Sequence, residues 1–418
     1  MIKVLPSEIS GTVKINPSKS ITQRAYAIAS LCKEKSVIKN PSKSDDSLSS
    51  LNIVKRMGST VEVFKDRVEI TGLQKEIEDK FDCGEAGLCI RMFTPILALF
   101  GKEVEITGRG SLLKRPVNMM EQPLREMGTI VETNNGFPPI KLNGKLKGGV
   151  VEVDAGLTSQ FLTGLLIALP NTEEKSRVIA KNTVSRPYID LTIELLRKAG
   201  AKVLNENYSV FEIEPAKFKP LNLEVEGDFS SACFMLVAGV LAGEVTVSNL
   251  SPSSKQADKK ILDILIQAGC GIKISEKGIT VEQSDIKSFS IDVRDCPDIV
   301  PSLVPLAAKG DKVSKIFGVS RLKYKESDRL NAMMKEFEKI GVKSEIKEDC
   351  LKIFPSKIEG GRANSNNDHR LAMALAVCGL VSEKGVEIEN HACISKSYPE
   401  FFNHLKAVKG KVITEGEK

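Results

Sequence analysis

Tryptophan is absent from this sequence, and aromatic residues and histidines are scarce. The 418 residues include no Trp, three His and 5% aromatic residues, and the net charge is only +6. Without a lysine-rich tail or interleaved aromatic side chains, nucleic acid is not an expected partner, whereas a small anionic substrate suits the modest positive charge. The histidines, His369, His391 and His404, are too scattered to predict a metal site.

Long apolar runs and paired cysteines are absent too. The longest apolar runs, such as residues 232–242, are too short to cross a bilayer, and residues 1–5 are typical of a strand rather than a secretory signal. The nine cysteines show no metal-ligand spacing. We therefore expect a cytoplasmic protein that binds no membrane and whose cysteines are reduced core residues, with a cysteine nucleophile as the alternative.

What the sequence does contain is a repeat. Six glycines follow apolar runs of helical period at intervals of 69 to 72 residues, and a β-like run follows most of them: Gly58, Gly128, Gly200, Gly269, Gly341 and Gly410. Glycine after the end of a helix adopts the left-handed conformation without steric cost. The constant period predicts one supersecondary unit copied six times, which at this length divides into two groups of three.

The opening of each unit repeats as well. Polar or small residues precede an apolar, buried helix at residues 17–20, 84–87, 156–160, 227–231, 295–298 and 366–369. Ser, Thr, Asp and Gly at such positions satisfy the free N–H groups of a helix start. If the six units packed about one axis, their positive helix ends would converge and favour anions.

Basic residues gather at several of these openings. Lys19 begins a predicted helix, and Ser20 and Arg24 share one of its faces because they are four residues apart. Lysine binds a phosphate as a point charge, and arginine binds it through two parallel hydrogen bonds. A capped surface helix with solvated charges is the alternative.

Two further segments combine charge with an apolar neighbour. Residues 325–329 carry four charges in five positions and open either a site or a solvated face, whereas Arg370 meets an apolar run and so needs a partner or an anionic ligand. Asp298 stands between a proline and an apolar run, where it serves either as a helix cap or as a general base.

Taken together, these segments resemble the family of 5-enolpyruvylshikimate-3-phosphate synthases over nearly the whole chain. The resemblance rests, in order, on residues 17–20 with Arg24, 44–46, Gly87 with Arg91, 158–162, 185–189, 295–298, 325–330, 367–370 and 395–399. It implies an α/β (α+β) fold of two lobes closing over a cleft, each lobe built from three βαβαββ units with buried helices. The implied lobes are residues 17–226 and residues 1–16 plus 227–418, with crossings near 15–17 and 225–228.

The resemblance also implies roles for individual residues. Shikimate-3-phosphate is expected at Lys19, Ser20, Arg24, Thr158, Ser159, Gln160, Ser185, Asp298 and Lys325. Phosphoenolpyruvate is expected at Lys19, Gly87, Arg91, Gln160, Arg329, Arg370 and Lys396. Asp298 would take the proton of the attacking 5-hydroxyl, and Glu326, with Lys19, would protonate the methylene carbon.

The physical demands of the implied reaction suit these residues. Each substrate phosphate carries roughly −1.5 to −2 charges near neutral pH, so the two substrates repel each other. Fixed cations must offset this repulsion before the reacting carbons approach, and seven are expected here: Lys19, Arg24, Arg91, Lys325, Arg329, Arg370 and Lys396. The implied products are 5-enolpyruvylshikimate-3-phosphate, an enol ether of the shikimate pathway, and phosphate, made by a monomer without metal or organic cofactor.

Three residues depart from the family pattern. Ser111 stands where the family usually has an arginine for phosphoenolpyruvate, and Arg109 or Lys114 are the candidates to replace it. Glu85 replaces an asparagine, and Leu88 replaces a threonine beside Gly87, the small residue of the site for the inhibitor glyphosate.

Two other functions stay open at this stage. UDP-N-acetylglucosamine enolpyruvyl transferases are similar, but the reactive cysteine of their loop has no counterpart in residues 111–115. The accepted acceptor substrate distinguishes the two enzymes. A non-catalytic binding homologue would bind shikimate-3-phosphate without turnover.

Overall fold

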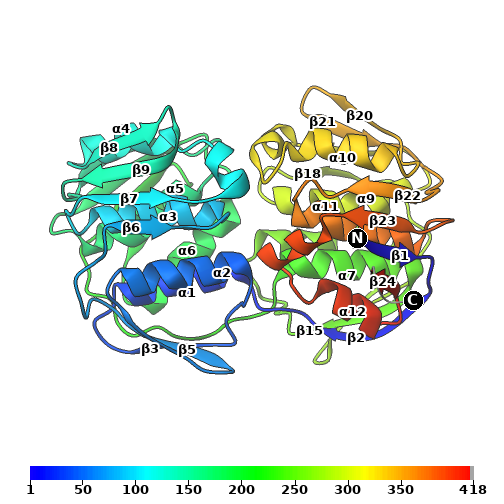
Figure 1. Ribbon diagram of the computed structural model, residues 1–418, viewed down its shortest axis with the longest axis horizontal. Helices are drawn as coiled ribbons and strands as arrows, with labels where there is room; N and C mark the ends of the chain where they lie inside the picture. Colours follow the sequence, from blue (N-terminus) through cyan, green and yellow to red (C-terminus); the bar gives the residue numbers. More distant parts are fainter. Residues whose placement is uncertain (415–418) are drawn as a thin grey trace. The chain divides into compact units, whose positions relative to one another are not determined.

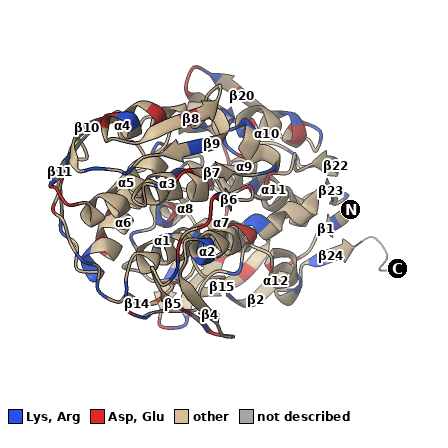
Figure 2. Ribbon diagram, turned by 60° about the vertical axis from the view of Figure 1, so that its left-hand side comes forward, with Lys and Arg blue, Asp and Glu red and all other residues tan. Residues whose placement is uncertain are grey.

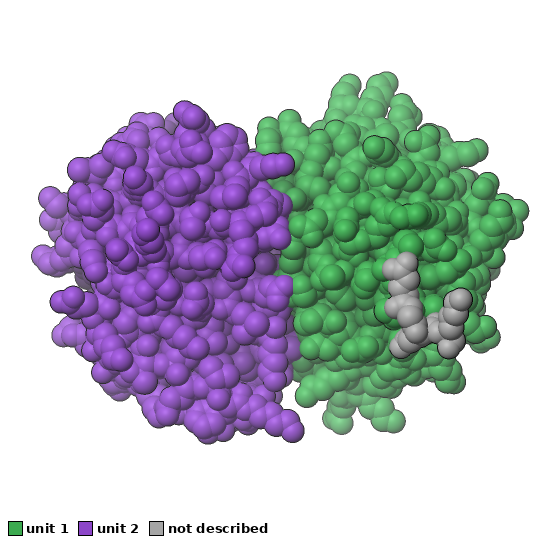
Figure 3. All heavy atoms as spheres, in the orientation of Figure 1, with its two compact units in different colours: residues 1–16, 226–418 green, residues 17–225 purple. Residues whose placement is uncertain are grey.

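Two compact units make up the chain in the computed structural model, which describes residues 1–414. Unit 1 contains Met1–Asn16 and Glu226–Lys418, and unit 2 contains Pro17–Val225 (Figure 3). Each unit holds three four-stranded sheets, and each sheet joins one parallel pair of strands to two antiparallel pairs (Figure 1). The predicted α/β fold of repeated units with helices is confirmed.

Unit 2 contains the sheets β14-β3-β5-β4, β6-β7-β9-β8 and β10-β11-β13-β12. Its strands are β3 (Ser36–Lys39), β4 (Thr60–Val63), β5 (Arg67–Thr71), β6 (Lys80–Asp82), β7 (Val104–Thr107), β8 (Ile130–Asn134), β9 (Phe137–Asn143), β10 (Gly149–Asp154), β11 (Ser176–Lys181), β12 (Val203–Glu206), β13 (Val210–Ile213) and β14 (Asn222–Glu224). Its helices are α1 (Lys19–Ser30), α2 (Asp45–Arg56), α3 (Gly87–Ala98), α4 (Glu121–Glu126), α5 (Gln160–Ala168) and α6 (Arg186–Lys198), with short 3-10 helices η1 (Gly110–Lys114), η2 (Asn118–Met120) and η3 (Leu169–Asn171).

Unit 1 contains the sheets β16-β17-β15-β2, β18-β19-β21-β20 and β22-β23-β1-β24. Its strands are β1 (Ile2–Leu5), β2 (Ile9–Lys14), β15 (Gly243–Ser248), β16 (Ile272–Ser275), β17 (Gly278–Glu282), β18 (Ser290–Asp292), β19 (Ser314–Phe317), β20 (Ser344–Lys347), β21 (Cys350–Ile353), β22 (Gly361–Asn364), β23 (Val386–Glu389) and β24 (Lys411–Thr414). Its helices are α7 (Phe229–Ala242), α8 (Ile261–Gln267), α9 (Val300–Ala308), α10 (Arg329–Glu338), α11 (His369–Leu380) and α12 (Phe401–Ala407), with 3-10 helices η4 (Ala257–Lys260), η5 (Pro297–Ile299), η6 (Ser320–Tyr324) and η7 (His391–Lys396).

Three sheets include a strand that comes from a distant part of the sequence. Strand β2 precedes α1 in the chain but pairs in parallel with β15, and β14 precedes α7 but pairs in parallel with β3. Strand β1 lies between β23 and β24 and so completes the last sheet with the beginning of the chain. The sequence period therefore marks the repeat correctly, although these three sheets are not built from one contiguous segment each.

One helix set is apolar on every side. All residues of α3, α9 and α11 are buried, as are all but Ser230 of α7 and all but Gln160 of α5. Within unit 1, α7, α9 and α11 pack on one another, and within unit 2, α3 packs on α5 (Figure 1). A helix that is hydrophobic all round belongs in a core, so the predicted buried helices are confirmed.

Five of the six repeat glycines act as predicted. Each follows a helix at a φ between +80° and +95°, for example Gly58 after α2 and Gly341 after α10. The sixth prediction is wrong by one residue: Lys409 takes the left-handed conformation, at φ 71°, and Gly410 follows it. The amide of Gly410 bonds the carbonyl of Leu405, five residues back, which is the pattern of a Schellman end.

The cysteines and the charges are distributed as in an ordinary globular protein. All nine cysteines are buried and unpaired, and no described helix is long and apolar enough to cross a membrane. Lysines and arginines alternate with acidic residues along the elements (Figure 2), and neither sign forms a tail in residues 1–414.

Candidate active site

Carboxylates occupy the N-terminal ends of three core helices in unit 1. Asp228 caps α7 by accepting from the amide of Ser231 at 2.8 Å, and Asp368 caps α11 by accepting from the amide of Arg370 at 3.0 Å. Asp298 lies in η5, directly before α9. Carboxylates therefore lie at all three helix starts, and Asp228 and Asp368 each accept one backbone amide there.

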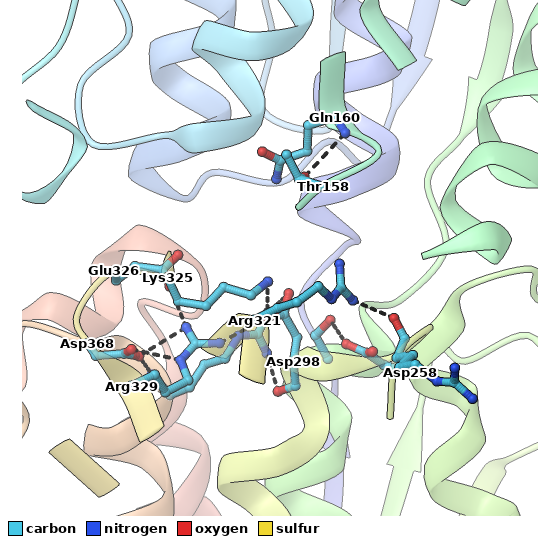
Figure 4. Close-up of polar contacts among 12 residues, drawn as sticks. Thr158, Gln160, Asp258, Asp298, Arg321, Lys325, Glu326, Arg329 and Asp368 are labelled. Atoms are coloured by element: carbon cyan, nitrogen blue, oxygen red, sulfur yellow. Dashed lines mark hydrogen bonds and ion pairs between the residues drawn. The ribbon is translucent and has the colours of Figure 1, made fainter. Parts of the chain in front are cut away.

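Three basic side chains contact the carboxylate of Asp298. Its Oδ1 lies 3.0 Å from Lys325 Nζ and 3.0 Å from Arg329 Nη1, and its Oδ2 lies 3.3 Å from Arg370 Nη2 (Figure 4). The Asp298 side chain keeps 23% of its surface exposed, whereas that of Arg329 has none exposed. Asp298, Lys325 and Glu326 are thus the partly exposed members of an ionic network whose centre is buried.

Arg329 is the buried centre of that network. It donates from Nε to Asp368 Oδ2 at 2.8 Å and from Nη2 to Glu326, in addition to its contact with Asp298. Asp368 is itself fully buried and also accepts from Ser327 Oγ at 3.4 Å. One guanidinium therefore joins three carboxylates and fixes where each of them points.

The other two predicted cations of unit 1 are also buried. Arg370 is 4% exposed and donates from Nη1 to the carbonyl of Asp298 at 3.3 Å. Lys396, at the end of η7, is 7% exposed and donates to the carbonyl of Asn367 at 2.9 Å. The residues predicted at 298, 325, 326, 329 and 370 thus form one connected cluster, and Lys396 adjoins it through the loop before α11.

Burial and charge compete at this cluster. Burial raises the pKa of Asp298, but Arg370, Lys325 and Arg329 outweigh it and hold that pKa well below its usual value. Burial lowers the pKa of Lys325, against the attraction of Asp298. Burial also opposes the charge of Arg329, yet Asp368, Glu326 and Asp298 raise its pKa. Asp298 is therefore ionised at neutral pH.

In unit 2, Arg24 is a buried cation held by neutral partners. It is 2% exposed and donates from Nε to Thr192 at 2.9 Å and from Nη2 to Thr163 at 3.4 Å, and it lies over the ring of Tyr188. Burial lowers the pKa of Arg24 to about 10. A fully buried guanidinium whose partners are hydroxyls keeps its capacity to attract an anion.

Lys19 and Ser20 occupy the first turn of α1. Lys19 Nζ lies 2.8 Å from Asp46 Oδ2, which ties the start of α1 to the start of α2. Ser20 accepts at its carbonyl from Arg24 Nη1 at 2.9 Å, so the two residues predicted to share a face are in contact. Ser18 caps this helix through the amide of Ile21.

The remaining acceptor-site candidates of unit 2 lie at the starts of α5 and α6. Ser159 precedes α5 and is buried, and the amide of Gln160 donates to Thr158 Oγ1 at 3.3 Å (Figure 4). Ser185 precedes α6 with a left-handed φ of 55°. The three repeat openings predicted in this unit, residues 17–20, 84–87 and 156–160, therefore all lie at helix N-termini, those of α1, α3 and α5.

Gly87 makes room for a buried arginine that the sequence analysis missed. A Cβ on Gly87 would lie 2.6 Å from Arg115 Cζ, so the guanidinium rests against the first turn of α3. Arg115 is 6% exposed, and Arg91, one turn into α3, donates to Gln160 Oε1 at 2.8 Å and to the carbonyl of Pro116 at 2.9 Å. The sequence shows that Arg115 ends a basic loop before a proline, but this does not distinguish it from the exposed basic residues of that loop.

The two departures at residues 85 and 111 form one contact. Ser111 donates to Glu85 Oε2 from its hydroxyl at 2.8 Å and from its amide at 3.0 Å. Glu85 therefore fastens the loop that carries Arg115. Arg109 pairs with Asp82 and is 73% exposed, and Lys114 is exposed as well. Among the basic residues of this loop, Arg115 is the buried one.

A metal-binding group is not apparent in the described part of the chain. Within residues 1–414, no three His, Cys, Asp or Glu side chains gather in a way that could hold a metal ion. The cluster around Asp298 instead offers arginine and lysine side chains, which bind carboxylates and phosphates.

Known proteins match this chain over nearly its whole length. The profile of EPSP synthase (3-phosphoshikimate 1-carboxyvinyltransferase) matches residues 5–405. The 3-phosphoshikimate 1-carboxyvinyltransferase of Clostridium perfringens is 36% identical over 414 residues, which cover 97% of this chain and 98% of that protein. The enzyme of that name from Aeropyrum pernix is 36% identical over 412 residues, covering 98% and 96%.

Solved structures share the fold. EPSP synthase from Acinetobacter baumannii superposes with a TM-score of 0.82 at 24% identity and 99% coverage of both chains. The enolpyruvyl transferase NikO from Streptomyces tendae superposes with a TM-score of 0.81 at 13% identity, covering 99% of this chain and 98% of that one. The fold is therefore that of the enolpyruvyl transferases. Within this class, the chain belongs to the EPSP synthase family, and the predicted 3-phosphoshikimate 1-carboxyvinyltransferase activity of the shikimate pathway is confirmed.

Proposed function

We propose that shikimate-3-phosphate and phosphoenolpyruvate are bound by two sets of the residues described above, each of which contains several basic side chains. Shikimate-3-phosphate is held by Lys19, Ser20, Arg24, Thr158, Ser159, Gln160, Ser185, Asp298 and Lys325, and phosphoenolpyruvate by Lys19, Gly87, Arg91, Gln160, Arg329, Arg370 and Lys396. The observation that carries this proposal is the cluster of three basic side chains around one partly exposed carboxylate, Asp298. A cation taken out of water needs an anion beside it, and the phosphate and carboxylate groups of the substrates meet that need as protein carboxylates do.

The chemistry follows from the positions of two carboxylates. Asp298 takes the proton of the 5-hydroxyl while that oxygen forms a bond to the central carbon of phosphoenolpyruvate. Glu326, which Arg329 holds in place, delivers a proton to the methylene carbon, assisted by Lys19. In the second half Glu326 takes back a proton from the methyl carbon, the carbon–carbon double bond re-forms, and the carbon–oxygen bond to phosphate breaks, so that phosphate leaves and accepts the proton held by Asp298. Fixed cations keep both anions in reach throughout.

We assign to Arg115 the role that the sequence analysis left to Arg109 or Lys114. Its guanidinium is buried against Gly87, whereas Arg109 is engaged with Asp82 at the surface. Arg91 emerges from the same helix start and is oriented by Gln160. The two arginines supply a planar, doubly charged surface of the kind that binds a phosphate or a carboxylate.

A phosphate-release assay tests the proposed function. Phosphoenolpyruvate with shikimate-3-phosphate should release phosphate, and phosphoenolpyruvate with UDP-N-acetylglucosamine should not. Release with the sugar nucleotide alone would reverse the assignment of the acceptor. Binding of shikimate-3-phosphate in calorimetry without any release would instead support a non-catalytic role.

Gly87→Ala should raise the KM for phosphoenolpyruvate about tenfold with little change in stability. The new Cβ would lie 2.6 Å from Arg115 Cζ, so the guanidinium must move, and one charged hydrogen bond to the donor is worth about 1.5–3 kcal/mol. Gly271→Ala is the matched control, because nothing lies within 4 Å of a Cβ there. Steady-state kinetics at saturating acceptor measures the effect; an unchanged KM would contradict the place given to Arg115.

Lys19→Met should raise the KM for shikimate-3-phosphate and lower kcat together. The ammonium is a charge that we assign to both substrates, and its removal leaves Asp46, now 2.8 Å away, as an uncompensated carboxylate. Lys43→Met, at an exposed lysine before α2, controls for the loss of one positive charge. A variant at Lys19 with near-normal kcat and KM would remove this residue from the site.

We further propose a cytoplasmic, monomeric enzyme that needs no added metal or organic cofactor. The nine buried thiols suit a reducing compartment. Size-exclusion chromatography with light scattering tests the monomer, and full activity after dialysis against EDTA tests the independence from metal. A dimer, or a loss of activity that Mg²⁺ or Zn²⁺ restores, would contradict these statements.

A further inference from the structure

Asn16 is a buried amide at the place where the chain first leaves unit 1. It follows β2, is 9% exposed, and stands directly before Pro17, the first residue of unit 2. A residue before proline is restricted to extended backbone conformations, which limits the directions open to its side chain. The place of the Asn16 amide is therefore set by the local sequence as well as by burial.

The backbone of Asn16 helps to join the two segments by which the chain crosses between the units. Its carbonyl accepts from the amide of Asp228 at 2.9 Å, in the segment that returns to unit 1. Asn249 joins the same two segments: its carbonyl accepts from the amide of Gly227 at 2.7 Å, and its Nδ2 donates to the carbonyl of Ile15 at 3.0 Å. Two asparagines therefore hold the crossing segments together within unit 1.

The side chain of Asn16 reaches a third segment, the turn that follows η7. Its Nδ2 donates to the carbonyl of Ser397 at 3.1 Å, and both residues are buried. The amide of Ser397 makes a local bond, to the carbonyl of Ile394 at 3.1 Å. Asn16 Oδ1 and Ser397 Oγ have no hydrogen-bond partner within residues 1–414. In that part of the chain, the bond from Asn16 is thus the hydrogen bond that attaches Ser397 to a distant segment.

Lys396 directly precedes this turn, and its Nζ donates to the carbonyl of Asn367 at 2.9 Å. A lysine side chain is long and flexible, so the reach of its ammonium depends on how firmly its backbone is held. Packing of Phe401 on Phe234 of α7 holds α12, but apolar contact has no preferred direction. The hydrogen bond from Asn16 does have one, and it orients the backbone next to Lys396.

We propose that Asn16 is a positioning residue that places Lys396 for the binding of phosphoenolpyruvate. This inference rests on the proposed function, in which Lys396 binds the donor substrate. The two lysines near Asn16 in the sequence or in space predict different results. Lys396 is assigned to phosphoenolpyruvate alone, whereas Lys19, three residues after Asn16, is assigned to both substrates. An effect through Lys396 therefore raises one KM, and an effect through Lys19 raises both.

Asn16→Ala tests the inference, because it removes the bond to Ser397 and leaves the backbone bond to Asp228 in place. At saturating shikimate-3-phosphate, the KM for phosphoenolpyruvate should rise about three- to tenfold, the range for loss of one buried hydrogen bond. The KM for shikimate-3-phosphate should stay within about twofold. An unchanged KM for phosphoenolpyruvate, or an equal rise of both KM values, would overturn the inference.

Asn249→Ala is the matched control for a loosened crossing. It removes an amide donor from the same segments, at a residue whose left-handed φ of 70° disfavours alanine. Its Tm in thermal unfolding should therefore fall at least as far as that of Asn16→Ala, while its KM for phosphoenolpyruvate stays within about twofold. A rise as large as that of Asn16→Ala would show that the crossing, and not the turn after Lys396, is responsible.

A double-mutant cycle with Lys396→Met separates this inference from the proposed function. If Asn16 acts through Lys396, Asn16→Ala should cause no further rise in the KM for phosphoenolpyruvate once Lys396 is methionine. Effects of the two substitutions that multiply would overturn the inference and leave the role of Lys396 intact. If Lys396→Met by itself leaves that KM unchanged, the proposed place of Lys396 in the donor site fails, and the inference fails with it.

Discussion

Asp298→Asn is expected to lower kcat about 10²- to 10⁴-fold, the range for loss of a general base. The KM values should change less, because the amide keeps the shape of the side chain and Lys325, Arg329 and Arg370 remain. Asparagine accepts a hydrogen bond from the 5-hydroxyl but does not take its proton. The substrate would still bind, but water would have to act as the base in place of the carboxylate.

The low pKa of Asp298 makes this expectation depend on the substrates. Burial raises that pKa, but the three cations outweigh it in the ligand-free protein, which makes the carboxylate a weak base. At the proposed substrate positions, phosphate and carboxylate groups would compete for the same cations, and each cation drawn away would raise the pKa of Asp298. We therefore expect the base to gain strength when both substrates are present, which would restrict proton removal to the complete complex.

Rapid-quench kinetics of phosphate release would measure the effect of Asp298→Asn on the chemical step. Asp292→Asn is the matched control, since Asp292 forms an exposed pair with Arg294 in the same unit. A second readout is acid stability. Because the folded pKa is depressed, the stability that ionised Asp298 confers is complete above about pH 4 and is lost as pH falls through the folded pKa. A kcat within threefold of the parent would exclude Asp298 as the base.

The sequence predicts the repeats well because their signal is local. A glycine after an apolar helix reports a left-handed residue that the chain itself requires, and Gly58 and Gly200 have it. Lys409 shows the limit: after α12 the left-handed residue is the one before the glycine, and the sequence did not indicate this shift. The exchange of β2 and β14 does not show in the repeat period, because strand pairing depends on partners more than 180 residues away. Only the family resemblance grouped residues 1–16 with residues 227–418.

The site shows the same division. Charged residues at helix starts, such as Asp298 and Arg370, could be named as site candidates from the sequence, because a charged side chain beside an apolar run needs a partner. The link between Glu85 and Ser111 was not, since each looks unfavourable alone and only the fold shows that they bind each other. Arg115 was overlooked because the sequence does not show which arginine of a basic loop is buried in the fold.

Arg329→Met should destabilise unit 1 by about 3–5 kcal/mol, the cost of leaving buried charges unpaired. The guanidinium has no exposed surface and joins Asp298, Glu326 and Asp368, the last of which is also fully buried. Methionine fills much of the same volume, so the loss reflects charge rather than a cavity. Arg329→Lys should recover only part of it, because an ammonium is a single point of contact for carboxylates that now receive a planar fork.

Urea unfolding followed by circular dichroism suits this measurement, since the chain has no tryptophan to report by fluorescence. Arg294→Met is the matched control: its pair with Asp292 is exposed and lies in the same unit, and such pairs contribute about 0–1 kcal/mol. The loss in the free energy of unfolding caused by Arg329→Met should be smaller in acid. Without Arg329 the three carboxylates have raised pKa values, so they regain protons as the pH falls. A deficit no larger than that of the control, or one independent of pH, would mean that the guanidinium does not hold these three carboxylates together.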